Sequence, residues 1–193
     1  MLHFYQDIRL FPDQEVGSRE IGNVLFSLLH LAFVQKKDET GKSRYAISFP
    51  EYTQGGTGSF GRFFRVLSYT REDLEDLNLE DIVDKLSGYA QCTSINEVPP
   101  VKTYMIFKRV QKKTNAERLA RRATKRHDMT IEEARQKYKL FKPSKSSDPF
   151  FYIHSSSTDK CFPLSITCEL TKSEEAGGFN LYGLSLGSAV PDF

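Results

Sequence analysis

Hydrophobic residues recur along the first hundred positions with the spacings of alternating strands and helices. Alternating apolar residues predict a strand at 3–10, and apolar residues at intervals of three and four predict a helix from Ser18. Two further strands are expected at 44–50 and 62–68, a second helix at 70–86 and a last strand at 89–95. The order βαββαβ is typical of a ferredoxin-like or RRM-like domain.

The second half of the chain, after the Pro99-Pro100 pair, has a different pattern. A strand is expected at 102–111, and the capping-box patterns Thr114-Asn-Ala-Glu117 and Thr130-Ile-Glu-Glu133 each predict the start of a short helix. β-rich runs follow at 150–154 and 162–170, and then a glycine-rich segment at 177–183. We therefore expect an α+β protein with a ferredoxin-like or RRM-like domain at 1–97 and a C-terminal domain at 98–193.

The composition is that of a globular chain. Of its 193 residues 39% are hydrophobic, and no stretch reaches the roughly 18 consecutive apolar residues of a membrane span. The three cysteines have no CxxC spacing, so neither a disulfide framework nor a cysteine-rich zinc site is expected. We expect a cytoplasmic protein with no membrane association.

The net charge of +2 conceals a strong division along the chain. Residues 101–145 contain fifteen lysines and arginines against four acidic residues, whereas the remainder contains twelve against twenty-one. A local excess of +11 within a nearly neutral chain predicts a polyanionic partner.

Five cations of the first predicted basic helix fall on one face. At 100° per residue they lie within about 140° of arc, while Leu119, Ala120 and Ala123 occupy the opposite side. The five are Arg118, Arg121, Arg122, Lys125 and Arg126. This pattern favours a nucleic acid, and the alternatives are another anionic partner or a solvated surface.

Arg109 and Gln111 are candidates for reading bases. They lie two positions apart on the predicted strand that leads into the basic helix, so they point to one face. Forked arginine and glutamine side chains can each pair with a base edge, although both residues could equally be exposed polar residues of an edge strand.

His30 is a candidate for proton transfer. It lies off the apolar stripe of the first helix, between Phe26 and Phe33 at i−4 and i+3, where an imidazole could act as a general base. The alternative is an ordinary surface histidine. The other histidines show no metal-ligand spacing with it, and no Walker A, Rossmann, HExxH or GxSxG motif occurs.

Two further segments could contact a nucleic acid. The hydroxyls of 155–158 could bind a ribose or a phosphate, although a serine run is also typical of a turn. Phe162 could stack on a base pair, or it could belong to the core.

These segments, in this order and spacing, resemble the CRISPR repeat-processing endoribonuclease of type I-F systems over the whole length of the chain. The parts that carry the resemblance are FYQDIRLFPD at 4–13, VLFSLLH ending at His30, RVQKKTNAERLARRATKRHD at 109–128, SSSTDKCF at 155–162 and GGFNLYGLS at 177–185.

The resemblance implies His30, Ser155 and Tyr182 as catalytic residues, with no metal and no cofactor. It implies that Arg109 and Gln111 read bases, that the basic helix enters the major groove of the hairpin, and that Phe162 stacks on the closing base pair. The expected reaction cuts CRISPR precursor RNA at the base of the repeat hairpin and leaves a 2′,3′-cyclic phosphate and a 5′-OH.

The resemblance also implies partners. The protein is expected to be a monomer when alone, to remain on its product hairpin, and to join the other subunits of the type I-F surveillance complex. The alternatives from a different class are a non-catalytic RNA-hairpin-binding subunit of a guide complex and, more distantly, a protein that binds duplex DNA.

Overall fold

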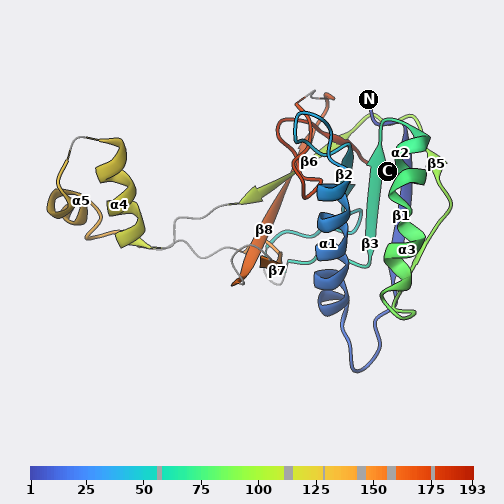
Figure 1. Cartoon of the computed structure of the whole chain (residues 1–193), viewed down its shortest axis with the longest axis horizontal. Helices are drawn as coiled ribbons and strands as arrows, with labels where there is room; N and C mark the ends of the chain where they lie inside the picture. Colours follow the sequence, from blue (N-terminus) through green and yellow to red (C-terminus); the bar gives the residue numbers. More distant parts are fainter. Residues whose placement is uncertain (56–57, 111–114, 128, 143–146, 156–159, 175–176) are drawn as a thin grey trace. The chain divides into compact units, whose positions relative to one another are not determined.

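The computed structural model describes residues 1–193 except 56–57, 111–114, 128, 143–146, 156–159 and 175–176, and of Ser155 it describes the backbone alone (Figure 1). The elements in the first part are β1 (Phe4–Leu10), α1 (Ser18–Gln35), β2 (Tyr45–Ser48), β3 (Phe63–Ser68), α2 (Arg71–Leu77), α3 (Leu79–Asp84), β4 (Ala90–Cys92) and β5 (Asn96–Glu97). Those in the second part are β6 (Tyr104–Val110), α4 (Ala116–Arg126), α5 (Ile131–Lys137), β7 (Phe150–Ser155), β8 (Lys160–Thr171) and β9 (Val190–Pro191).

The described residues form two compact units, which differ from the two domains expected from the sequence. The larger unit contains 1–109 and 147–193, and the helical unit contains 110–146. The difference arises because Phe107, Phe151, Leu164 and Phe179 share one hydrophobic core with α1 and the first sheet. No helix in the described part of the chain is long and apolar enough to cross a membrane.

The first sheet of the larger unit is antiparallel and has the strand order β2-β3-β1-β4, with β5 also paired to β1. The strands predicted at its centre and the helix predicted from Ser18 are present. The single helix expected at 70–86 is wrong, because the chain breaks into α2 and α3 at Asn78, whose φ is +50°. Asparagine tolerates this left-handed conformation better than most residues, so it can end one helix and begin another.

The second sheet of the larger unit has the strand order β7-β8-β6-β9. Strands β7 and β8 form an antiparallel pair in which Ile153 lies opposite Phe162 and Ser155 lies opposite Lys160. The two sheets make the larger unit a mixed α/β structure.

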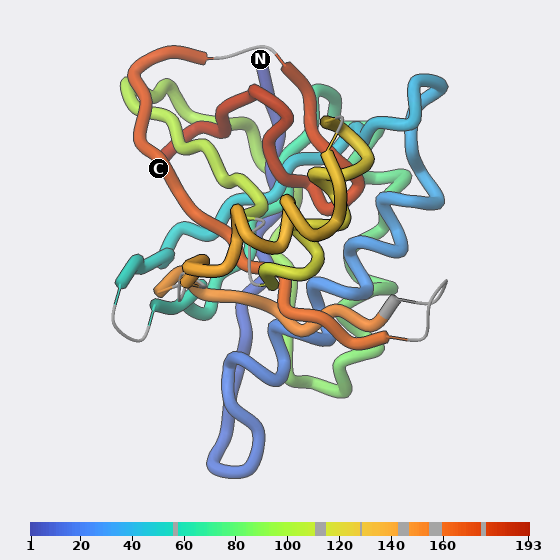
Figure 2. The backbone as a smooth tube through the Cα atoms, turned by 90° about the vertical axis from the view of Figure 1, so that its left-hand side faces the viewer, coloured from blue at the N-terminus to red at the C-terminus, as the bar shows by residue number. Residues whose placement is uncertain are grey.

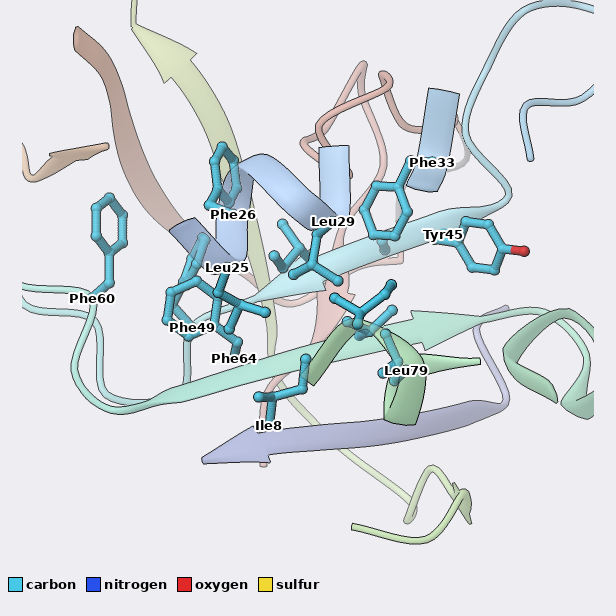
Figure 3. Close-up of a cluster of buried hydrophobic side chains, with 14 of the residues drawn as sticks. Ile8, Leu25, Phe26, Leu29, Phe33, Tyr45, Phe49, Phe60, Phe64 and Leu79 are labelled. Atoms are coloured by element: carbon cyan, nitrogen blue, oxygen red, sulfur yellow. The ribbon is translucent and has the colours of Figure 1, made fainter. Parts of the chain in front are cut away.

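The core of the larger unit lies between α1 and the first sheet. Leu25, Leu29 and Phe33 of α1 point toward the sheet, from which Ile8 and Phe64 point back (Figure 3). All five side chains are at most 1% exposed, so α1 is fixed along its whole buried face.

The glycine-rich segment near the end of the chain returns to β2. The Ser43 N–H donates to the Phe179 carbonyl at 3.1 Å, and the Ile47 N–H donates to the Gly183 carbonyl at 2.9 Å. Figure 2 shows the path of the backbone, with the end of the chain in red. Gly183 has φ +72°, and a Cβ there would lie 2.9 Å from the Phe33 ring and 3.0 Å from the Ile47 nitrogen. Glycine is therefore required where the segment approaches the core.

The helical unit packs α4 against α5 through small residues. Ala120, Ala123 and Ala134 are all at most 5% exposed. The predicted capping box at Thr130 is present, with Glu133 as its partner. The other predicted cap, Thr114, lies outside the described residues, and the N-cap of α4 is Asn115, whose side chain accepts hydrogen bonds from the N–H groups of Glu117 and Arg118.

We predict that Gly183→Ala destabilises the larger unit far more than Gly88→Ala. Gly88 also has positive φ, at +87°, but a Cβ there meets nothing within 4 Å, so its substitution tests backbone strain alone. We expect Gly88→Ala to lower the free energy of unfolding by about 1 kcal/mol and Gly183→Ala by about 3 kcal/mol, because the second variant adds a clash. Chemical denaturation measures both, and equal losses would contradict the close packing at Gly183.

Candidate catalytic and nucleic-acid-binding site

His30 is held by a hydrogen bond to the glycine-rich segment. Its Nδ1 lies 2.8 Å from the carbonyl oxygen of Leu181, and the residue is half-buried. Because a carbonyl oxygen only accepts hydrogen bonds, a neutral His30 carries its proton on Nδ1. Its Nε2 then keeps a lone pair, which is the form of imidazole that can accept a proton from a substrate.

The face of the His30 ring is covered by Tyr182. The two ring centroids are 3.9 Å apart with an interplanar angle of 12°. Tyr182 is nearly parallel to Phe26 at 6.0 Å, Phe26 stacks on Phe151 at 4.4 Å, and Phe151 stacks on Phe60 at 3.9 Å. We call these five rings the aromatic stack. It connects the imidazole to the core, so neither side chain of the His30–Tyr182 pair can rotate freely.

Arg109 and Phe162 border the same site. The Arg109 guanidinium carbon lies 5.5 Å from the centroid of the Phe162 ring and 6.0 Å from that of Tyr182. Arg109 is exposed and Phe162 is half-buried. The fold thus brings together four predicted residues that are far apart in sequence, namely His30, Arg109, Phe162 and Tyr182.

Strand β7 runs beside α1 toward this site. The Arg19 guanidinium carbon lies 4.2 Å from the centroid of the Phe150 ring, and Asn23 accepts a hydrogen bond from the Tyr152 N–H at 3.0 Å. The helix and the strand therefore run in the same direction from their N-terminal to their C-terminal ends. Ser155 is the last residue of β7.

Two predicted residues cannot be compared in the same way. Gln111 lies outside the described residues, and so does the side chain of Ser155. Their assigned roles stay predictions.

No group of three or more histidine, cysteine, aspartate or glutamate residues is arranged to hold a metal ion within the described ranges of the chain.

The cationic face predicted for the basic helix is present on α4. Leu119, Ala120 and Ala123 are buried on one side, and all five predicted cations are exposed. The first turn of α4 also contains Glu117, which forms two hydrogen bonds with Arg135 of α5, at 2.9 and 3.1 Å. Glu117 also forms an ion pair with Arg121, whose Nε lies 3.5 Å from the Glu117 Oε1. This carboxylate therefore connects the two helices and also contacts one cation of the cationic face.

Two contributions to the site were not predicted from the sequence. Leu181 acts through its backbone carbonyl, which every residue type possesses, and Phe26 was expected only as a neighbour of His30 along the helix. The available signal for the first was the asparagine and glycine that flank Leu181 and Tyr182, because these residue types favour tight turns.

Comparisons with known proteins identify the family of this mixed α/β protein. Residues 5–193 match the family described as CRISPR-associated protein (Cas_Csy4). A relative from Pseudomonas aeruginosa (strain UCBPP-PA14) is 36% identical and one from Escherichia coli (strain UTI89 / UPEC) is 30% identical, each over 190 residues that cover 98% of both chains. Both relatives are named CRISPR-associated endonuclease Cas6/Csy4.

A solved structure described as "An RAMP protein binding different RNA substrates" is 10% identical, with a TM-score of 0.36 over the whole of both chains. From the family match and the two curated relatives, this chain belongs to the Csy4 family of CRISPR-associated proteins.

We predict that acid loosens α5 from α4 through Glu117. The hydrogen bonds from Arg135 hold the pKa of Glu117 below its ordinary value of 4.5. A carboxyl group whose folded pKa is lowered stabilises the fold above its unfolded pKa, and this contribution is lost as the pH falls through the folded value. NMR chemical shifts of α5 should therefore lose helical character below about pH 4.5 in the wild type.

Glu117→Gln removes the titrating carboxyl group. The α5 chemical shifts of the variant should therefore be less helical than those of the wild type already at neutral pH, and they should change less on acidification. Glu39→Gln, an exposed substitution in the larger unit, is the control and should behave as the wild type. An equal acid response in Glu117→Gln and the wild type would contradict the assignment.

Proposed function

We propose that this chain is a metal-independent endoribonuclease that cuts CRISPR precursor RNA at the base of the repeat hairpin and stays bound to the product. The hydrogen bond from His30 Nδ1 to the Leu181 carbonyl, at 2.8 Å, carries the proposal. The names of the two curated relatives, CRISPR-associated endonuclease, support the processing of CRISPR RNA.

His30 is the general base of the proposed reaction. Its Nε2 takes the proton of a ribose 2′-OH, and the 2′ oxygen attacks the adjacent phosphorus. The bond from phosphorus to the 5′ oxygen then breaks, and that oxygen takes up a proton. The products are a 2′,3′-cyclic phosphate and a 5′-OH, and Tyr182 orients the imidazole throughout.

The path of β7 supports a role for Ser155 beside His30. From Asn23 to His30 the axis of α1 rises about 10 Å, and from Tyr152 to Ser155 a strand also advances about 10 Å. Because Asn23 and Tyr152 are hydrogen-bonded to each other, the end of β7 should lie level with His30. We assign the Ser155 hydroxyl to the ribose or the phosphate at the cut.

Arg109 and Phe162 are assigned to the foot of the hairpin. In this assignment Arg109 and Gln111 pair with base edges, and Phe162 stacks on the closing base pair. The contact of Arg109 with the rings of Phe162 and Tyr182 supports the assignment, because it puts a forked donor close to the proposed cutting residues.

The cationic face of α4 is assigned to the stem. RNA presents a deep, narrow major groove whose bases are hard for side chains to reach, so the helix would sense the positions of the phosphates. The exposure of all five cations supports this role.

The strand order β2-β3-β1-β4 with helical crossovers supports a ferredoxin-like arrangement of the N-terminal part of the chain. We further propose a cytoplasmic protein that is monomeric when alone and joins other subunits of the type I-F surveillance complex after cutting.

We predict that His30→Ala slows cleavage by about 10²- to 10⁴-fold, the range for loss of a general base, while the affinity for the hairpin is unchanged. Single-turnover cleavage of the genome's own repeat RNA, in the presence of a chelator, measures the rate. His3→Ala, which removes an exposed histidine from the start of the chain, is the matched control and should cut normally.

A substrate with hydrogen in place of the ribose 2′-OH at the cut should not react with the wild type. Undiminished cleavage by His30→Ala would refute the general base, and chelator-sensitive cleavage would refute metal independence. Tight hairpin binding without any cleavage by the wild type would favour a non-catalytic RNA-binding subunit.

We predict that hairpin affinity depends on salt through α4. If all five cations neutralise phosphates, the logarithm of the affinity should fall against the logarithm of salt concentration with a slope on the order of −3 to −4. Arg122→Gln should reduce the size of that slope by about 1. Lys172→Gln, an exposed change beyond the far end of β8, is the control, and an unaltered slope in Arg122→Gln would contradict the role of α4.

A further inference from the structure

A five-residue turn presents both groups that contact His30. Leu181 contributes its carbonyl to Nδ1, and Tyr182 contributes its ring to the face of the imidazole. The turn is closed by backbone bonds at 2.8 Å from Asn180 N–H to the Leu184 carbonyl and from Gly183 N–H to the Asn180 carbonyl. The two contacts on His30 therefore depend on one local conformation.

The side chain of Asn180 bonds inside this turn. Its Oδ1 accepts hydrogen bonds from the Tyr182 N–H at 2.8 Å and from the Leu184 N–H at 3.2 Å. These bonds fix the peptide plane that precedes Tyr182, and this plane contains the Leu181 carbonyl. Within the described part of the chain, Asn180 forms no hydrogen bond or ring contact with His30, so any effect on the imidazole must pass through the turn.

We propose that Asn180 is a positioning residue that keeps His30 protonated on Nδ1 and leaves Nε2 ready to accept the 2′-OH proton. The inference rests on the proposed function for its effect on cleavage, but its effect on the imidazole is independent of RNA. An imidazole without a fixed acceptor at Nδ1 exchanges between two tautomers, and only one of them has a lone pair on Nε2.

The flanks of the turn are anchored separately from Asn180. The Phe179 carbonyl accepts a hydrogen bond from Ser43, which precedes β2, and the Gly183 carbonyl accepts one from Ile47 of β2. The Ser185 N–H donates to the Phe107 carbonyl at 2.9 Å. Loss of the Asn180 side chain should therefore disturb the turn without releasing the segment. This makes Asn180 testable in a folded protein.

Two substitutions at Asn180 separate the acceptor oxygen from the rest of the side chain. Asn180→Ala removes the acceptor, and we expect single-turnover cleavage at saturating protein to slow by about 10- to 100-fold, the size of effect that a small misplacement of a catalytic group produces. Asn180→Asp keeps an oxygen in the same position and should cut close to the wild-type rate. The affinity for the hairpin should not change in Asn180→Ala.

Asp13 offers a matched control. Its Oδ1 also accepts two backbone hydrogen bonds, from the N–H groups of Glu15 and Val16, at 2.8 and 2.7 Å. Asp13→Ala thus removes the same kind of interaction from a loop that does not contact His30. It should cut normally, which excludes a general effect of losing such a turn.

The imidazole provides a readout that a merely structural role would not move. The nitrogen chemical shifts of ¹⁵N-labelled His30 in the RNA-free protein distinguish protonated Nδ1 from protonated Nε2. We expect a protonated Nδ1 in the wild type and in Asn180→Asp, and a mixture of tautomers in Asn180→Ala.

The inference is overturned if Asn180→Ala leaves the His30 nitrogen signals unchanged, or if Asn180→Asp slows cleavage as much as Asn180→Ala. Wild-type protein that does not cut RNA, combined with the expected change in the imidazole, would sustain the positioning by Asn180 and refute the proposed function instead.

Discussion

The hydrogen bond between the His30 imidazole and the Leu181 carbonyl joins residues that are 151 positions apart. It can form only if α1 is fixed against the first sheet and the glycine-rich segment is fixed against β2. Gly183 allows the glycine-rich segment to pack against β2, because the absence of a Cβ leaves room for the Phe33 ring and the Ile47 nitrogen. The same bond decides which nitrogen of His30 faces a substrate, so packing in the core determines the chemistry proposed for the surface.

The aromatic stack adds rigidity to this arrangement. Hydrogen bonding alone would leave the imidazole free to tilt about the Nδ1 contact, whereas Tyr182 at 3.9 Å restricts the ring plane. Tyr182 is in turn limited by Phe26, which is 1% exposed. A general base is effective when its geometry is set before the substrate arrives, and stacked rings restrict orientation at a small cost in side-chain entropy.

The helical unit is built on a different principle. Its core consists mainly of alanines, and Arg135 bonds Glu117 across the two helices. Small residues let α4 and α5 approach closely and leave the long cationic side chains exposed. The proposed division of labour is that the larger unit cuts while α4 holds the stem through phosphates.

The amino-acid sequence by itself determined the longer strands, the amphipathic helix that contains His30, and the cationic face of α4, because these features depend on spacings of a few residues. It also indicated Phe162 as a candidate for stacking, and Tyr182 through the resemblance. It did not predict the two-residue strands β5 and β9. It also did not predict the break at Asn78, whose left-handed backbone conformation ends α2 although the helical spacing of apolar residues continues. Nor did it predict that 147–193 would join the core of 1–109. An apolar run shows that a segment will be buried, but it does not show against which other segment. Only the tertiary structure decided that Leu181 would meet His30, because a backbone carbonyl has no side-chain signature and its position depends on contacts across the whole larger unit.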